Sequence, residues 1–279
     1  MLGALWLLDA ALQAQPHLFG AEWWHDDLAQ SVMGQPSPIA RSILWVVNRM
    51  AGHSAVWNTS FVIAEAILGL CLLAGRLERA AITASIPWAL GIWWIGEGFG
   101  SLPSGFGLSA AGSPGPVLLY PLLGLLAWPS PSERPRLPPS AVHADGALAG
   151  WAALWVGGAA MLLPWKFAPG RVLQANLEEH SVDQPRWLAG IAHHTYQLVG
   201  AHPLLVPVAL ATAEVLVGLG VLHGRSQRMA LAVGILLSVV FWVVFQELGG
   251  IVGGDATDPG IAPLLVLLAF AMWPSPPMR

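Results

Sequence analysis

Long apolar runs separated by short polar stretches dominate the chain. Each run is long enough to form a helix that crosses a bilayer, or nearly so if neighbouring helices shelter it. The runs cover 2–19, 56–74, 80–100, 116–128, 147–167, 204–222, 229–249 and 261–273. They are continuous rather than alternating, which disfavours the strands of a β-barrel. The pattern predicts an all-α membrane protein with about eight transmembrane helices.

The two halves of the chain repeat one pattern. AEAILGLCLLAGRLERA, from Ala64, aligns with AEVLVGLGVLHGRSQRMA, from Ala213, so that positions 65 and 214 are both glutamate, at an offset of 149. The same offset pairs Trp6 with Trp155, His53 with His202, Gly69 with Gly218, Gly75 with Gly224, Arg76 with Arg225, Arg79 with Arg228, Trp93 with Trp242, Glu97 with Gln246 and Gly100 with Gly249. After a small shift, SPGPVLLYPLLGLLAWPSP aligns with DPGIAPLLVLLAFAMWPSP. We predict two repeats, 1–137 and 147–279, joined by an exposed linker at 138–146, with the boundary near Pro138.

Each repeat contains four of the predicted spans and therefore crosses the membrane an even number of times. Both repeats then have the same orientation, which gives two parallel tandem four-helix bundles. Between the first and second span of each repeat, SPIARSILWVVNRMAG and QPRWLAGIAHHTYQLVG mix large apolar side chains with Arg, Asn and His. This mixture is typical of helices that lie in the membrane interface. Pro38 and Pro185, near their starts, fit positions in the first helical turn.

Composition agrees with a membrane protein and removes several other classes. Hydrophobic residues make up 55% of the 279 residues and charged residues only 10%, with 15 Trp against two Tyr. A soluble exterior rarely has so little charge, and indole rings favour the membrane boundary. The net charge of -4, without a basic cluster, excludes nucleic acid as a partner. Cys71 is the only cysteine, which excludes an intramolecular disulfide and a thiolate metal cluster.

The distribution of basic residues predicts the orientation. The connections that follow spans two, four, six and eight contain Arg76, Arg79, Arg134, Arg136, Arg225, Arg228 and Arg279. The opposite loops are rich in Asp and Glu instead. Because arginine-rich loops stay in the cytoplasm, we expect a multi-pass plasma-membrane protein with both termini cytoplasmic.

Acidic side chains inside the apolar runs are the first candidates for chemistry. Glu65 and Glu214 lie near the middle of the second span of each repeat, and Asp9 lies in the first span, where its counterpart is Gly158. An unpaired carboxylate at membrane depth is costly to ionise, so these groups should be protonated or paired. They could form a proton relay or a ligand site, or they could hold two helices together by hydrogen bonds.

The third span of each repeat ends in a glycine-rich turn with a polar residue beside tryptophan. Glu97 lies beside Trp93 in WWIGEGFGSLPSG, and Gln246 lies beside Trp242 in FWVVFQELGGIVGG. Irregular backbone at membrane depth is tolerated where it lines a cavity or is buried in protein. We therefore predict a ligand pocket at this outer end, with a plain interfacial turn as the alternative.

Most histidines fall on the predicted outer side, and His53 and His202 are matched by the repeat at the entrances to the second spans. Imidazoles there could bind a quinone carbonyl, exchange protons, ligate a metal or make structural hydrogen bonds. None of the spacings is a zinc or haem signature. We predict no metal site.

The four-span unit resembles the DoxX/DoxD-like membrane family. The resemblance rests on a polar first span, an acid in the second, the WWxGEGxG-like end of the third and a proline-bounded fourth, and two such units are fused here. It implies a four-helix bundle and association with redox partners, including the membrane subunit of thiosulfate:quinone oxidoreductase. By this resemblance Glu65, Glu214, Glu97 and Gln246 line the bundle interior or a quinone site. Glu97 becomes Gln246 and Asp9 becomes Gly158 in the second repeat, so the two sites cannot share one acid–base behaviour.

We therefore expect a membrane component of a quinone-linked or other electron-transfer system. The sequence contains no cofactor motif, so a partner protein should supply the redox centre, and whether the chain is itself an enzyme stays open. Quinone is the expected small ligand, ahead of haem or a metal. The alternatives are a carrier for a small solute or metal ion and a non-catalytic membrane anchor or assembly subunit.

Overall fold

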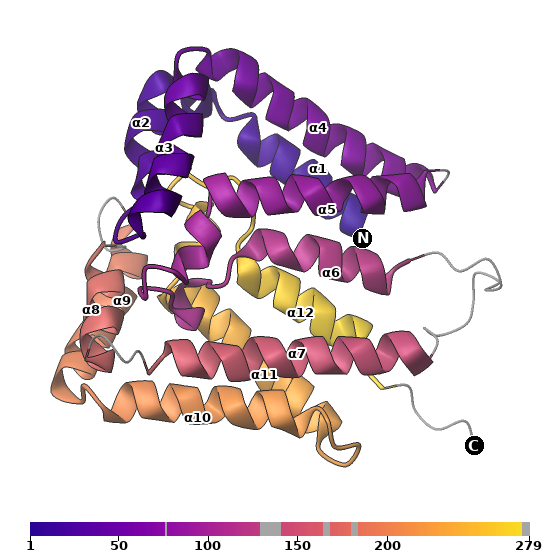
Figure 1. Ribbon diagram of the computed structural model, residues 1–279. Coiled ribbons are helices and arrows are strands. Elements are labelled where there is room, and N and C mark those ends of the chain that lie inside the picture. The colour runs from indigo at the N-terminus through magenta and orange to yellow at the C-terminus, as the bar shows by residue number, and fades with distance from the viewer. Residues whose placement is uncertain (76, 129–140, 164–167, 180–183, 275–279) are drawn as a thin grey trace. The chain divides into compact units, whose positions relative to one another are not determined.

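The computed structural model describes residues 1–75, 77–128, 141–163, 168–179 and 184–274. Within these residues the secondary structure is entirely helical, without a strand (Figure 1). The predicted helical class is therefore confirmed. The predicted boundary at Pro138 and several residues used for orientation lie outside the described residues, namely Arg76, Arg134, Arg136 and Arg279.

The chain forms two compact units that follow the two repeats, apart from one short exchange. Unit 1 consists of Met1–Gly107, Pro114–Pro135 and Gly254–Pro259. Unit 2 consists of Leu108–Ser113, Arg136–Gly253 and Gly260–Arg279. Each unit therefore includes a six-residue segment that belongs to the other repeat in sequence.

Unit 1 is a helical bundle in which each of the four predicted spans contains a helix. Helix α1 packs along α4, and α5 packs against both α4 and α6. Its helices are α1 Leu2–Gln13, α2 Ala21–Gln30, α3 Ser37–Ala51, α4 Ser54–Ala74, α5 Glu78–Ile95 and α6 Leu119–Leu126, with 3-10 turns η1 Pro16–Phe19, η2 Gly98–Ser101 and η4 Pro116–Leu118.

Unit 2 repeats this plan, since α7 packs against α10 and α11 packs against α12. Its helices are α7 Ala141–Met161, α8 Pro169–Glu179, α9 Arg186–Ala201, α10 Leu205–Gly220, α11 Gln227–Val244 and α12 Ile261–Ala271, with 3-10 turns η3 Ser109–Ala111 and η5 Glu247–Gly250. Helix α7 begins at Ala141, within the stretch predicted as linker, so the described part of 138–146 is helical rather than extended.

Two helices, α4 and α11, are long and apolar enough to cross a membrane. A third candidate exists if α9 and α10, which meet at a bend of 105°, form one span. Helices α1 and α12 belong to a class of shorter apolar helices of 10–17 residues. The described residues therefore contain two or three candidate spans, and most of the eight predicted spans contain helices shorter than predicted.

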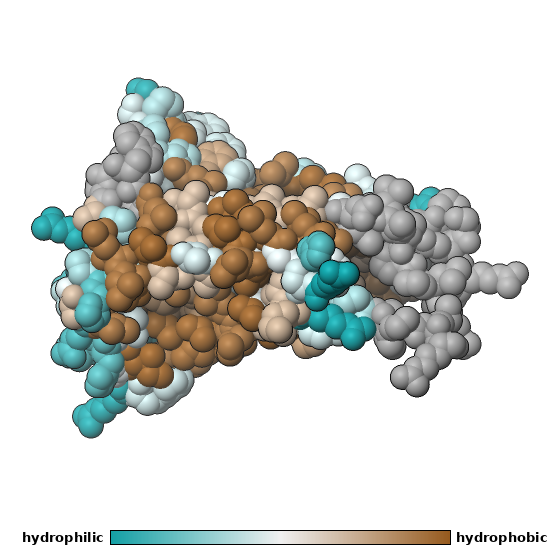
Figure 2. Space-filling view, turned by 90° about the horizontal axis from the view of Figure 1, so that it is seen from below, coloured by the Kyte–Doolittle hydropathy of each residue, from teal (hydrophilic) through white to brown (hydrophobic). Residues whose placement is uncertain are grey.

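Apolar side chains are abundant on the surface as well as in the core. Helix α4 exposes Ile63, Ile67 and Leu70, and α10 exposes Leu205 and Leu216. In the view of Figure 2, on the side where α10 lies, hydrophobic residues cover most of the middle and hydrophilic residues gather toward the ends. Such faces suit contact with lipid better than contact with water.

The two segments predicted as interfacial are both helical. Helix α3 buries Ile43 and Val47 and exposes Trp45, whose ring centroid lies 5.3 Å from the Arg49 guanidinium carbon. Pro38 lies in the first turn of α3, as predicted. Pro185 is instead the residue that immediately precedes the first turn of α9, which suits proline because that position needs no helical N–H donor.

Both units bring their first and second long helices into close contact at a repeat-matched glycine. A methyl group at position 69 would lie 2.8 Å from the carbonyl oxygen of Gly3, and one at position 218 would lie 3.1 Å from that of Ala152. Small residues allow such close approach of helix backbones.

The turns after α5 and α11 also share one unusual backbone. Phe99 and Gly100 have φ of 57° and 60°, and the repeat-matched Leu248 and Gly249 have φ of 58° and 69°. Left-handed φ is uncommon for a bulky residue and is retained only where the surrounding structure enforces it. The matched geometry shows that both repeats keep the same exit from the third helix.

We expect Gly69→Ala to lower the stability of unit 1. The added methyl would press on the Gly3 carbonyl and on Leu7, and overpacking of this kind costs about 1–3 kcal/mol. The matched control is Gly157→Ala on α7, where a methyl group meets nothing within 4 Å. Thermal unfolding of the detergent-solubilised protein tests this expectation, and an unchanged or higher Tm for Gly69→Ala would contradict it.

Candidate functional site

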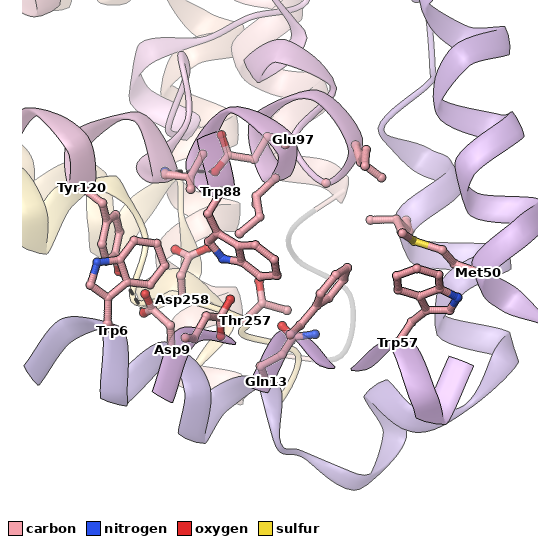
Figure 3. A pocket seen from close by; sticks show the side chains of 18 of the residues that line it. Trp6, Asp9, Gln13, Met50, Trp57, Trp88, Glu97, Tyr120, Thr257 and Asp258 are labelled. Atoms are coloured by element: carbon pink, nitrogen blue, oxygen red, sulfur yellow. Dashed lines mark hydrogen bonds between the residues drawn. The ribbon is translucent and has the colours of Figure 1, made fainter. Parts of the chain in front are cut away.

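Unit 1 encloses a cavity of about 370 Å³, a volume within the range of small-molecule binding sites. Residues from all six helices of unit 1, α1 to α6, and from the segment 254–259 line it (Figure 3). The lining consists of Trp6, Asp9, Gln13, Trp23, Leu28, Met50, Trp57, Phe61, Glu65, Pro87, Trp88, Gly91, Ile92, Ile95, Gly96, Glu97, Val117, Tyr120, Thr257 and Asp258. The lining is thus mostly aromatic and aliphatic, with a few carboxyl and amide groups.

Four carboxyl groups meet at this cavity from four separate parts of the chain. The sequence predicted three of them, Asp9, Glu65 and Glu97, and the structure adds Asp258. Asp9 and Glu65 are buried. In Figure 3, Asp258 lies beside Trp88 near the middle of the cavity, between Asp9 at one end and Trp57 at the other. The lining contains no lysine, arginine or histidine.

Tyr120 on α6 positions Asp9. Its hydroxyl donates a hydrogen bond to Asp9 Oδ1 at 2.8 Å, and its ring lies 4.5 Å from that of Trp6 between centroids. All three side chains are buried. A buried carboxyl group needs such a partner, because an unsatisfied one is costly in an apolar interior. The hydrogen bond therefore fixes Asp9 at the cavity wall.

A second polar pair holds α1 against α4. The Gln13 side-chain amide donates to Asn58 Oδ1 at 2.5 Å, and Asn58 Nδ2 donates to the Gln13 backbone carbonyl at 2.9 Å. Both residues are buried. This amide pair therefore joins α1 to α4 by hydrogen bonds.

Glu97 lies in the turn that follows α5. Its Oε1 accepts a hydrogen bond from the Val117 amide at 3.1 Å, while Oε2 has no hydrogen-bond partner among the described residues. Gly115 makes room for it: its φ is 118°, and a methyl group there would overlap Oε2. The glycine of SPGPV is thus required for the position of Glu97. Glu65 Oε2 is likewise buried without a hydrogen-bond partner in the described structure.

In unit 2 the matched acid has a different environment. Ser109 Oγ donates to Glu214 Oε1 at 2.8 Å, and a methyl group at Gly158 would lie 2.6 Å from Glu214 Oε2. Glu214 therefore occupies the space that an aspartate at position 158 would need, which explains why Asp9 has a glycine counterpart. Gln246 donates its side-chain amide to the Ala110 carbonyl at 2.9 Å.

The remaining predicted residues lie away from the cavity lining. His53 and His202 are exposed at the beginning of α4 and the end of α9. Trp93 is not among the lining residues, and its indole N–H donates to the Pro114 carbonyl at 2.6 Å. Trp242 lies on α11 near Gly260 in unit 2. The structure therefore places Asp9, Glu65 and Glu97 in the lining of one cavity. The lining does not include His53, His202, Trp93 or Trp242.

The residues that make the cavity aromatic and polar occur in the first repeat and not in the second. At the offset of 149, Val206, Leu210 and Leu237 replace Trp57, Phe61 and Trp88, and Leu162 and Pro207 replace Gln13 and Asn58. Trp6 alone among these aromatic residues keeps an aromatic counterpart, Trp155. The aromatic and amide side chains suited to binding a ligand thus belong to unit 1.

Sequence reasoning missed Tyr120, Trp88, Thr257 and Asp258. Tyr120 is one of only two tyrosines in the chain, and its counterpart in the shifted alignment is Leu265. The shifted alignment also places Asp258 opposite Ser113, which marks an added charge in the second copy of the motif. No local pattern indicates that this segment belongs to unit 1. Among the described residues, no group of three or more His, Cys, Asp or Glu side chains could hold a metal ion.

We expect Tyr120→Phe to destabilise unit 1 by about 1–3 kcal/mol, because the buried Asp9 carboxyl loses its donor. Tyr196→Phe on α9 is the matched control, since it makes the same change outside the cavity. Thermal unfolding of both variants in detergent provides the measurement. Equal Tm values for the two variants would show that the Tyr120 hydrogen bond does not stabilise the bundle.

No family model, curated protein sequence or solved structure matches the chain.

Proposed function

We propose that the chain is a plasma-membrane protein made of two DoxX/DoxD-like four-helix repeats, with eight membrane-spanning helices and both termini in the cytoplasm. The shared plan of the two repeats and the exposed apolar faces of α4 and α10 support this proposal. The short helices α1, α6 and α12 fit a bundle in which neighbours shelter them or the local bilayer is thin. Helices α3 and α9, with exposed Trp45 and Trp187, then lie at the outer interface.

Within this protein, unit 1 binds a quinone and serves as the membrane component of an electron-transfer system. One observation carries this assignment: four acids and four tryptophans, together with Tyr120, line a single cavity inside a bundle of apolar helices. Aromatic and aliphatic walls suit a flat, weakly polar ring. The few polar groups can hydrogen-bond its carbonyl oxygens when they carry a proton.

The chemistry of the cavity matches the proton requirement of quinone reduction. A quinone becomes a quinol by taking up two electrons and two protons, one proton on each carbonyl oxygen. A partner redox protein supplies the electrons, because the chain has no cofactor motif. Glu65 and Asp9 supply protons by general acid catalysis and are later reprotonated. The Trp6 indole N–H, which is buried without a hydrogen-bond partner among the described residues, is a further donor for a carbonyl oxygen.

A second function, transport of a small organic cation, is favoured by a different observation. The lining contains four carboxyl groups and no basic side chain, and tryptophan rings attract cations. Saturable binding of benzyltrimethylammonium that excludes menadione would select this function over quinone binding. A pure anchor, by contrast, would bind neither probe.

We expect Glu65→Gln to slow proton uptake by bound menadione at least tenfold, since an amide cannot deliver a proton and a positioned general acid contributes roughly 10²–10⁴-fold. Photoreduced flavin supplies the electrons, and a pH-indicator dye reports the uptake in the purified protein. Glu214→Gln is the matched control in unit 2, where Ser109 already hydrogen-bonds the carboxyl group, and its rate should stay within about twofold of wild type by the same comparison.

Two outcomes would contradict this assignment. In one, the wild-type protein shows no saturable quenching of tryptophan fluorescence by menadione. In the other, menadione binds, but Glu65→Gln takes up protons as fast as the wild-type protein. Matching Tm values for the wild type and both variants ensure that the comparison reports chemistry rather than folding.

A further inference from the structure

The segment Gly254–Pro259 follows α11 in the second repeat but belongs to unit 1. It contributes Thr257 and Asp258 to the cavity lining. Neither residue has an equivalent in the first repeat's own connection, where the aligned positions are Gly112 and Ser113. The cavity of unit 1 is therefore completed by a segment from the other repeat.

Two contacts with η1 and its flank hold this segment in place. Gln15 Nε2 donates to the Ala256 carbonyl at 2.9 Å, and His17 Nε2 lies 3.8 Å from Asp255 Oδ1. Ala256 is buried, whereas the Asp255 side chain is 77% exposed. The segment is thus fixed at Ala256, with one carboxyl group in solvent at Asp255 and another at the cavity wall at Asp258.

Asp258 lines the same cavity as the other three acids and Tyr120. It interacts electrostatically with Asp9 on α1, Glu65 on α4, Glu97 after α5 and the Tyr120 hydroxyl on α6. Asp9 and Glu65 are only 4% and 6% exposed, whereas Asp258 is half-buried. Asp258 therefore offers the two buried acids a partly exposed carboxyl group on the same cavity wall.

We propose that Asp258 is the proton-exchange residue of the cavity, passing protons between water at the exposed segment 254–259 and the buried carboxyl groups of Glu65 and Asp9. Each transfer moves one proton: Asp258 takes it from water and gives it to a buried carboxylate, and the reverse path returns it. This role deepens the proposed quinone chemistry and rests on it for the use of the protons. The exchange itself occurs without quinone.

The counterpart of Asp258 in the first repeat explains why one unit has this path. Ser113, which aligns with Asp258, lies in unit 2 and accepts a hydrogen bond from the Leu108 amide at 2.9 Å through its hydroxyl oxygen. A serine hydroxyl does not ionise near neutral pH, so it cannot take up and release a proton as a carboxyl group does. The exchange of segments between the repeats thus places the proton-exchanging group in unit 1 alone.

Infrared spectroscopy of the full-length protein, transferred into ²H₂O without quinone, measures this exchange directly. The carbonyl band of protonated carboxyl groups shifts when the proton is replaced by deuterium, and its loss in Glu65→Gln assigns the band. We expect Asp258→Asn to slow the shift at least tenfold. Asp255→Asn, the same change three residues earlier on the exposed side of the segment, should leave the rate within twofold, and Asp258→Glu should restore it.

Asp258→Ser, which introduces the residue found in the first repeat, is the second variant if the asparagine variant fails to fold. Wild-type exchange rates in both folded variants would overturn the inference, as would the absence of any carboxyl band that Glu65→Gln removes. Menadione binding is measured in the same samples. Slow exchange in Asp258→Asn without menadione binding in the wild type would support the proton path and refute the quinone assignment. Fast exchange in Asp258→Asn together with menadione binding in the wild type would refute the proton path and support the quinone assignment.

Discussion

The placement of carboxyl groups inside an apolar helix bundle is the constraint on which the rest of the structure depends. Three of these acids have a hydrogen-bond donor close by: Tyr120 donates to Asp9, the Val117 amide donates to Glu97, and Ser109 donates to Glu214. Because a buried polar group without a partner costs free energy, these partners restrict the sequence around the three acids. Glycines at 115 and 158 then provide the space that the carboxyl groups occupy.

The two repeats have kept one backbone and diverged in what it encloses. The close glycine contacts at Gly69 and Gly218 and the left-handed turns at Phe99 and Leu248 occur at the same offset. Apart from Trp6, whose counterpart is Trp155, the aromatic and amide side chains around the cavity have no such counterpart in the second repeat. After duplication and exchange of short segments, one copy supplies Asp258 to the site of the other. The site thus gains a carboxyl group while the helices of both bundles stay the same.

Much of the fold could be predicted because a helix produces a local pattern of apolar residues in the sequence. Apolar runs predicted a helix in every expected span, and the offset of 149 matched glycines that the structure places in equivalent contacts. Helix lengths were predicted less well, since apolar residues such as those at the end of 2–19 continue past Gln13 into the 3-10 turn η1. The start of α7 at Ala141 was missed because the preceding prolines suggested a linker.

The site was predicted in part. Asp9, Glu65 and Glu97 stood out as acids in apolar surroundings, and they line one cavity. Asp258 and Tyr120 approach from distant segments, and a long-range contact leaves no periodic signal in the sequence. His53 and His202 match in the repeat, but both are exposed at helix ends. A match between repeats therefore marks equivalent helix ends as readily as it marks a functional site.

Labelling with a photoreactive azidoquinone, followed by peptide mass spectrometry of the full-length protein, tests the central claim that the cavity of unit 1 holds a quinone. The account predicts saturable labelling that menadione suppresses, on cavity residues such as Trp57, Phe61 and Trp88. Labelling concentrated on α10 or α11, or labelling that menadione does not suppress, would contradict it.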